Sequence, residues 1–111
     1  MSRFYNIQLN IKGFDMDRVS QITTACKDEW SFEDMDIHQM DTDPVMIGDA
    51  EGNLCSGETE DEFADRISAA IWKANNGFCP ITVRAMYLED LPYEIHERVH
   101  KHYQRWLKKA A

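Results

Sequence analysis

The chain has 111 residues, of which 43% are hydrophobic and 11% aromatic, and this composition fits one folded domain and excludes a disordered chain. Its formal net charge of −8 argues against nonspecific attraction to DNA, RNA or anionic lipid. The apolar runs fall far short of the roughly 18 residues that span a bilayer, and no signal-peptide pattern opens the sequence. We therefore expect a single cytoplasmic domain over residues 1–111.

Cysteine usage supports the same compartment. Cys26, Cys55 and Cys79 are an odd number at wide spacings, without a CxxC pair, which indicates neither a disulfide framework nor a zinc knuckle. Free cysteines are among the most buried residue types. We expect all three to be small buried side chains in a reducing cytoplasm.

The first elements follow from hydrophobic periodicity. Residues 4–11 alternate apolar and polar side chains, which predicts a half-buried strand. Gly13 interrupts the pattern, and Asp15 is a suitable N-cap for a helix from Asp15 to Trp30. The apolar residues of that helix recur at helical spacing at Val19, Ile22, Cys26 and Trp30.

Alternation returns over residues 32–40, which predicts a second strand with Met35 and Ile37 directed inward. Two short apolar segments, 45–47 and 53–55, then flank the glycine-containing segment 48–52. Glycines with short acidic residues favour a tight turn, so we predict a small hairpin or a bent strand here.

A capping box begins the next helix. Thr59 and Glu62 can satisfy each other's backbone amides, and an apolar stripe follows them. The segment 75–77, Asn-Asn-Gly, predicts a left-handed helix end. Residues 79–88 then alternate on two fairly apolar faces and predict a strand.

Asp90 and Pro92 indicate the start of a last helix, over about 92–109, with basic residues toward its C-terminus. The element order predicts an α+β fold, a ferredoxin-like split βαβ sandwich (β-α-β-β-α-β) with an added C-terminal helix docked on it. We expect that helix to cover part of the sheet face that the other two helices leave open. Its predicted apolar stripe comprises Ile95, Val99, Tyr103 and Trp106.

Within this predicted helix, residues 96–100 spell H-E-x-x-H. On a helix, His96 and His100 would share one face and could bind a metal, with Glu97 as a general base. However, the sequence downstream offers His102 alone, which would lie on another side of the helix, and catalytic zinc normally takes three protein ligands. We therefore treat the motif as a chance match, with a metal-binding protein or small zinc hydrolase using His96 and His100 as the alternative.

Other catalytic patterns are missing. The sequence contains no P-loop, GxGxxG or GxSxG pattern, and its acidic turn, residues 41–53, lacks the ligand spacing of a calcium loop. We therefore expect no cofactor and no enzymatic activity.

The charge distribution carries the functional prediction. Between Asp28 and Asp65 stand 14 acidic residues and no Lys or Arg. Such a tract can steer a basic partner, such as the Lys/Arg groove of a nucleic-acid-binding protein, whereas the alternative is a solvated edge that adds solubility. We predict that the chain binds a basic protein partner, and not nucleic acid or membrane directly; a homodimeric structural module is a further alternative. The predicted binding residues are Glu33, Asp34, Asp36, Asp41, Asp43, Asp49, Glu51, Glu58, Glu60 and Asp61.

One stretch resembles known sequences. The residues IWKANNGFC at 71–79, continuing with ITVRAMYLEDLPYE at 81–94, are similar to segments of small uncharacterised bacterial and prophage-type proteins. The resemblance carries no catalytic motif. It implies a small accessory protein of a prophage or other mobile element.

Overall fold

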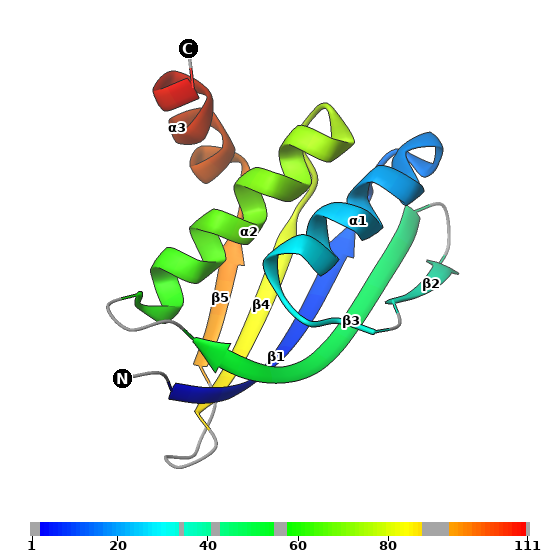
Figure 1. The fold of residues 1–111 in the computed structure, drawn as a ribbon. Coiled ribbons are helices and arrows are strands. Elements are labelled where there is room, and N and C mark those ends of the chain that lie inside the picture. The colour runs from blue at the N-terminus through cyan, green and yellow to red at the C-terminus, as the bar shows by residue number, and fades with distance from the viewer. Residues whose placement is uncertain (1–2, 34, 41–42, 55–57, 88–93, 111) are drawn as a thin grey trace.

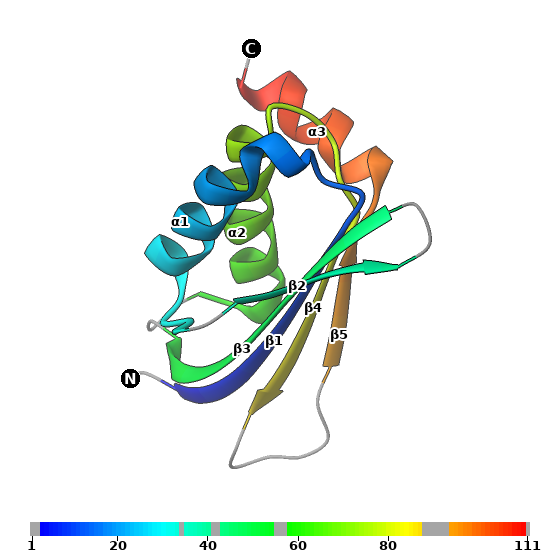
Figure 2. The same cartoon turned by 90° about the vertical axis from the view of Figure 1, so that its right-hand side faces the viewer.

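The computed structural model describes residues 3–33, 35–40, 43–54, 58–87 and 94–110. These residues form a five-stranded antiparallel sheet with the strand order β2-β3-β1-β4-β5, and three helices (Figure 1). The helices α1 and α2 pack side by side on the same face of the sheet, as the side view in Figure 2 shows. The predicted α+β class with an antiparallel sheet is therefore confirmed.

The central strand is β1 (Arg3–Lys12), which pairs with β3 on one side and with β4 on the other. Its alternation is the predicted one, because the odd-numbered side chains are buried against the helices and the even-numbered ones face away. The core therefore lies between this face of β1 and the two helices. The core side chains of β1 are Tyr5, Ile7, Leu9 and Ile11.

The first helical segment begins with a 3-10 turn, η1 (Met16–Arg18), and continues as α1 (Val19–Glu29). Asp15 caps this segment as predicted, since its side chain accepts a hydrogen bond from the Asp17 amide at 3.0 Å. The Asp15 amide donates to Oδ1 of Asn75 at 2.8 Å, which joins the start of this segment to the end of α2.

The second helix, α2 (Glu60–Asn75), has both ends that the sequence predicts. The Glu62 amide donates to the Thr59 hydroxyl at 3.1 Å, and the Thr59 amide donates to the Glu62 carboxylate at 3.0 Å. At the other end, Asn76 adopts the left-handed conformation with φ 60°. Local sequence therefore determines where this helix begins and ends.

Of the two predictions for residues 45–55, the bent strand is confirmed and the hairpin is not. The whole segment is one continuous strand, β3 (Asp43–Leu54), which bends along its length in Figure 1 and pairs with β1 from Val45 to Leu54. A Cβ on Gly52 would lie 2.9 Å from the Trp30 ring, and one on Gly48 would lie 2.8 Å from the Met35 side chain. These glycines therefore allow side chains to cross the strand closely, and they do not turn the chain.

The edge strand β2 (Met35–Met40) is shorter than predicted. Met35 packs against the core as expected. Ile37, which was also predicted to point inward, is 40% exposed. Ile37 nevertheless lies on the inward face as predicted, because it pairs with the buried Met46, which pairs with Ile11. It stays partly exposed because β2 is an edge strand, paired with β3 alone.

After β4 (Ile81–Tyr87), the predicted C-terminal helix 92–109 is present but begins later than expected. Glu94–Arg98 forms a fifth strand, β5, which pairs with β4 so that Val83 lies opposite His96. Only then does α3 (His100–Ala110) begin. The sheet therefore has a fifth strand that the sequence did not predict, because Pro92 indicated the start of a helix at this point.

The position of α3 differs from the prediction as well. Tyr103 and Trp106 pack against Trp72 of α2, with ring centroids 5.3 and 5.9 Å apart, so α3 docks beside α2 and leaves the other face of the sheet uncovered. Ile95 and Val99, the other members of the predicted stripe, precede this helix and are exposed. No helix in the described part of the chain is long and apolar enough to cross a membrane.

Candidate functional site

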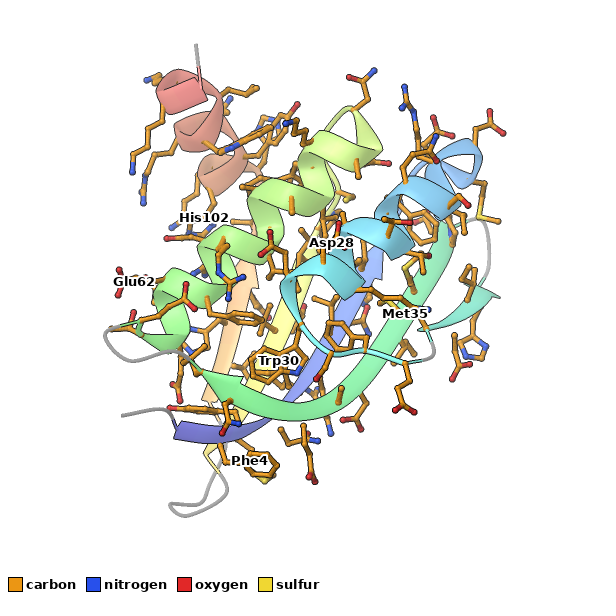
Figure 3. The ribbon with its side chains drawn as sticks, viewed as in Figure 1. Phe4, Asp28, Trp30, Met35, Glu62 and His102 are labelled. Atoms are coloured by element: carbon orange, nitrogen blue, oxygen red, sulfur yellow. The ribbon has the colours of Figure 1, made fainter. Side chains whose placement is uncertain are left out.

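The described helices leave uncovered the sheet face opposite α1 and α2, which we call the open face. It carries the even-numbered side chains of β1, and Figure 3 shows one of them, Phe4, pointing away from the helices. One row of paired residues crosses all five strands on this face. Its members are Asp36, Ile47, Asn10, Thr82 and Glu97.

A shallow depression of about 450 Å³ lies in the middle of the open face. Neutral polar side chains and the two cations Lys12 and Arg84 line it from β1 and β4, and Ile47 and Ile95 flank it from β3 and β5. The Oδ1 atom of Asn10, which is buried there, has no hydrogen-bond partner within the described residues. A buried acceptor without a partner is costly to the fold, so this depression is not built for stability alone.

Carboxylates mark both ends of the cross-strand row, at Asp36 on β2 and Glu97 on β5. Asp49 and Glu51 extend the negative charge along β3, and both are exposed. Nδ2 of Asn6 donates to Oδ1 of Asp49 at 2.8 Å, which fixes that carboxylate above the sheet. The β2–β3 half of the open face is therefore acidic.

The predicted acidic surface is thus only partly one surface. Asp36, Asp49 and Glu51 lie together on the open face, and Glu33 and Asp43 are exposed nearby, before β2 and at the start of β3. Asp34 and Asp41 lie outside the described residues.

The remaining predicted acids, at and before the start of α2, have intramolecular partners. Nε of Arg66 donates to Glu58 at 2.9 Å, and Nε2 of His96 lies 3.6 Å from Glu60. Nη2 of Arg98 donates to Asp61 at 2.7 Å, and this hydrogen bond is the main reason why the pKa of Asp61 is lowered. These acids are engaged within the chain by Arg66, His96 and Arg98, which lie beyond the acidic tract.

The H-E-x-x-H motif does not form a helical metal site. His96 and Glu97 belong to β5 and point to opposite faces of the sheet. His100 is the first residue of α3, and its ring packs edge-on against Phe78 with ring centroids 5.1 Å apart. Across the described ranges, no three His, Cys, Asp or Glu side chains are grouped so that they could hold a metal ion. The motif spans a strand and a helix, so its helical spacing has no meaning.

Two cysteines confirm their predicted burial. Cys26 and Cys79 have no exposed surface and are free thiols. Burial raises the pKa of each to about 12, and the charge of Cys79 adds to the shift of Cys26. Neither thiol is a nucleophile at neutral pH, since the thiolate is the reactive form. Cys55 lies outside the described residues.

Sequence reasoning missed the polar residues of the depression, such as Gln8, Asn10 and Thr82. The alternation of β1 predicted a polar face, but only the strand order shows that β1 and β4 lie side by side. Comparison with known proteins adds no candidate residues, because no family model, curated protein or solved structure matches the chain.

Proposed function

We propose that this protein is a small non-enzymatic binding module that takes a basic protein partner, of the nucleic-acid-binding type, on the open face. The observation that carries the proposal is the uncovered sheet face, with Asp36 and Glu97 at the ends of one row across its five strands. Lys and Arg side chains of a partner can pair with these carboxylates.

Long-range charge supports the same partner class. The net charge of −8 attracts a basic surface, and the exposed carboxylates of Asp49 and Glu51 direct it toward the β2–β3 half of the open face. We now propose a smaller binding set than the sequence predicted, because the acids near the start of α2 have partners within the chain. The set is Glu33, Asp36, Asp43, Asp49 and Glu51.

The fold and the setting belong to the same proposal. We propose that the first four strands with α1 and α2 form a ferredoxin-like split βαβ unit, which β5 and α3 extend; the order β2-β3-β1-β4 supports this assignment. The free thiols of Cys26 and Cys79 support a cytoplasmic setting. An accessory role in a prophage or mobile element follows from the resemblance of residues 71–94.

A panel of purified basic nucleic-acid-binding domains, immobilised and probed with this protein at several salt concentrations, tests the function. We expect binding to weaken as the salt concentration rises. Duplex DNA should displace this protein, because the two would compete for the same basic surface of the immobilised domain. D49N/E51Q should weaken binding and flatten its salt dependence. The control D17N/D28N removes the same charge from the helical side, where both residues are exposed, and should bind like the wild type.

Equal losses in both double variants would reduce the effect to net charge and contradict a defined surface. Binding that ignores salt would also contradict the proposal.

The second candidate function is a homodimer that buries the open face. It is favoured by three exposed apolar side chains on that face, Phe4, Ile47 and Ile95, which are 41%, 40% and 52% exposed. Sedimentation over a range of concentrations tests it. A mass near twice 13.0 kDa that falls for Ile47→Asp would support the dimer.

A further inference from the structure

A second hollow lies away from the open face, between α2 and α3. It measures about 150 Å³ and is lined by Trp72 and Asp65 of α2 and by His102, Arg105, Trp106 and Lys109 of α3. The ring centroids of Trp72 and Trp106 are 5.9 Å apart, and the two ring planes are inclined to each other by 47°. Figure 3 shows His102 on the side of α3 next to α2. We call this hollow the indole cleft.

The dimensions and the walls of the indole cleft suit a single aromatic ring. A cavity of about 150 Å³ is large enough for a benzene molecule. Indole faces and edges attract a further ring in stacked or edge-on arrangements. The orientation of the Trp72 ring is fixed, because its Nε1 donates a hydrogen bond to the Cys79 carbonyl at 2.9 Å.

The rim of the indole cleft is positively charged. Arg105 and Lys109 are one helical turn apart on α3, a helix that contains four bases and no acid. Asp65, the carboxylate in the lining, already accepts a hydrogen bond from Nε of Arg98 at 2.8 Å. Its charge is therefore shared with Arg98, so Arg105 and Lys109 give the rim its positive character.

The titration of His102 agrees with a positive rim. Its pKa is lowered first by desolvation and then by the charges of Arg98, Lys101 and Arg105, which outweigh the opposing charge of Asp65. Nδ1 of His102 also accepts a hydrogen bond from the Val99 amide at 3.1 Å. A neutral His102 thus lines the cleft while Arg105 and Lys109 provide its charge.

We propose that the indole cleft binds a small aromatic carboxylate, with its ring against Trp72 and Trp106 where both line the cleft and its carboxylate at Arg105 and Lys109. This site is independent of the open face, and its occupant is a small molecule, not a protein. Arg and Lys both suit a carboxylate, with Arg able to donate two parallel hydrogen bonds.

Phenylacetate is a suitable probe, and the three tryptophan indole N–H signals in a ¹H–¹⁵N NMR spectrum are the readout. We expect saturable shifts of the Trp72 and Trp106 signals. The Trp30 signal should not move, because its Nε1 donates to the Ala50 carbonyl under β3, far from α3. Shifts of all three signals, or of none, would overturn the proposal.

Charge is tested with ligand and protein variants. Phenylacetamide has the same ring and shape without the charge, and we expect it to bind roughly threefold to tenfold more weakly. R105Q/K109Q should lower phenylacetate affinity by a similar factor, whereas Lys108→Gln, on the same helix but outside the cleft lining, should not. Equal binding of phenylacetate and phenylacetamide, or an equal loss in Lys108→Gln, would overturn the site.

Discussion

Arg98 in the last strand binds Asp61 in the first turn of α2, with Nη2 2.7 Å from Oδ1 across 37 residues of sequence. The same guanidinium donates to the Asp61 and Glu97 carbonyls at 2.9 Å and to the Asp65 carboxylate at 2.8 Å. Arg98 is only 4% exposed. The buried side chain of Arg98 therefore links β5 to α2. It also pairs with Asp61, whose charge is then no longer free within the predicted acidic surface.

Replacing Arg98 by Met should destabilise the protein. Met keeps much of the side-chain volume but leaves four acceptors without their donors, so we expect a loss of about 2 to 3 kcal/mol in the free energy of unfolding. Urea denaturation measures it. Arg105→Met, at an exposed arginine of α3, is the control and should change stability little. Similar values for the two variants would show that the Arg98 network adds nothing.

Gly52→Ala tests why β3 contains glycine. The new Cβ would lie 2.9 Å from the Trp30 ring, whose Nε1 is held by the Ala50 carbonyl at 3.0 Å, so the ring cannot move away freely. We expect a loss of about 1 to 3 kcal/mol from overpacking. Gly77→Ala is the matched control because no atom lies within 4 Å of its Cβ position. If Gly52→Ala were as stable as Gly77→Ala, the close approach of Trp30 would not constrain this strand.

The capping box of α2 gives a local prediction. Thr59→Ala removes the hydroxyl that accepts from the Glu62 amide, and should cost about 1 kcal/mol. Thr24→Ala, at an exposed position within α1, makes the same change away from a cap and should be neutral or stabilising, since Ala favours helix. Thermal unfolding of the two variants measures the difference. A smaller loss for Thr59→Ala than for Thr24→Ala would contradict the capping role.

Acid should loosen the start of α3 through His102. Its pKa is lower in the fold than in the unfolded chain, where it is about 6.5, so the neutral form favours folding and this stability is lost as pH falls below about 6.5. Burial and the charges of Arg98, Lys101 and Arg105 disfavour the charged ring, and a protonated Nδ1 could no longer accept from the Val99 amide. Hydrogen exchange of the Val99 amide should therefore show less protection at low pH, after correction for intrinsic exchange rates.

His102→Gln is the control for this titration. The glutamine carbonyl can accept the same hydrogen bond from Val99, as Glu or Gln does at this position of a capping box, but it does not titrate. The variant should keep its Val99 protection across the same pH range. If it loses protection as the wild type does, another group controls the effect.

Local signals were sufficient for part of the fold. The alternation of residues 4–11, the capping box at Thr59 and the stop at Asn76 all predicted elements correctly, because neighbouring residues fix these features. The sequence left a hairpin and a bent strand open for residues 45–55, and the strand formed because Gly48 and Gly52 allow Phe32, Met35 and Trp30, which are distant in sequence, to approach it closely. The strand β5 was missed because its pairing with β4 outweighs the helical periodicity of residues 95–106.

The candidate site also combines features that local sequence predicts with features that depend on tertiary contacts. The sequence located Asp36, Asp49 and Glu51, which lie on the open face. It did not show that Arg66, His96 and Arg98 reach the acids around the start of α2, because those contacts depend on tertiary packing. The depression and the indole cleft likewise combine residues from separate elements, and no spacing within the chain encodes them.

The most direct test of the central claim is NMR mapping of backbone amides while a short peptide rich in arginine and lysine is added at low salt. Binding on the open face predicts saturable shifts at Asn6, Asn10 and Asp49, which shrink as salt is added. Shifts confined to α1 or to the first turn of α2, with the amides of β1 and β3 unmoved, would contradict the open face as the binding surface.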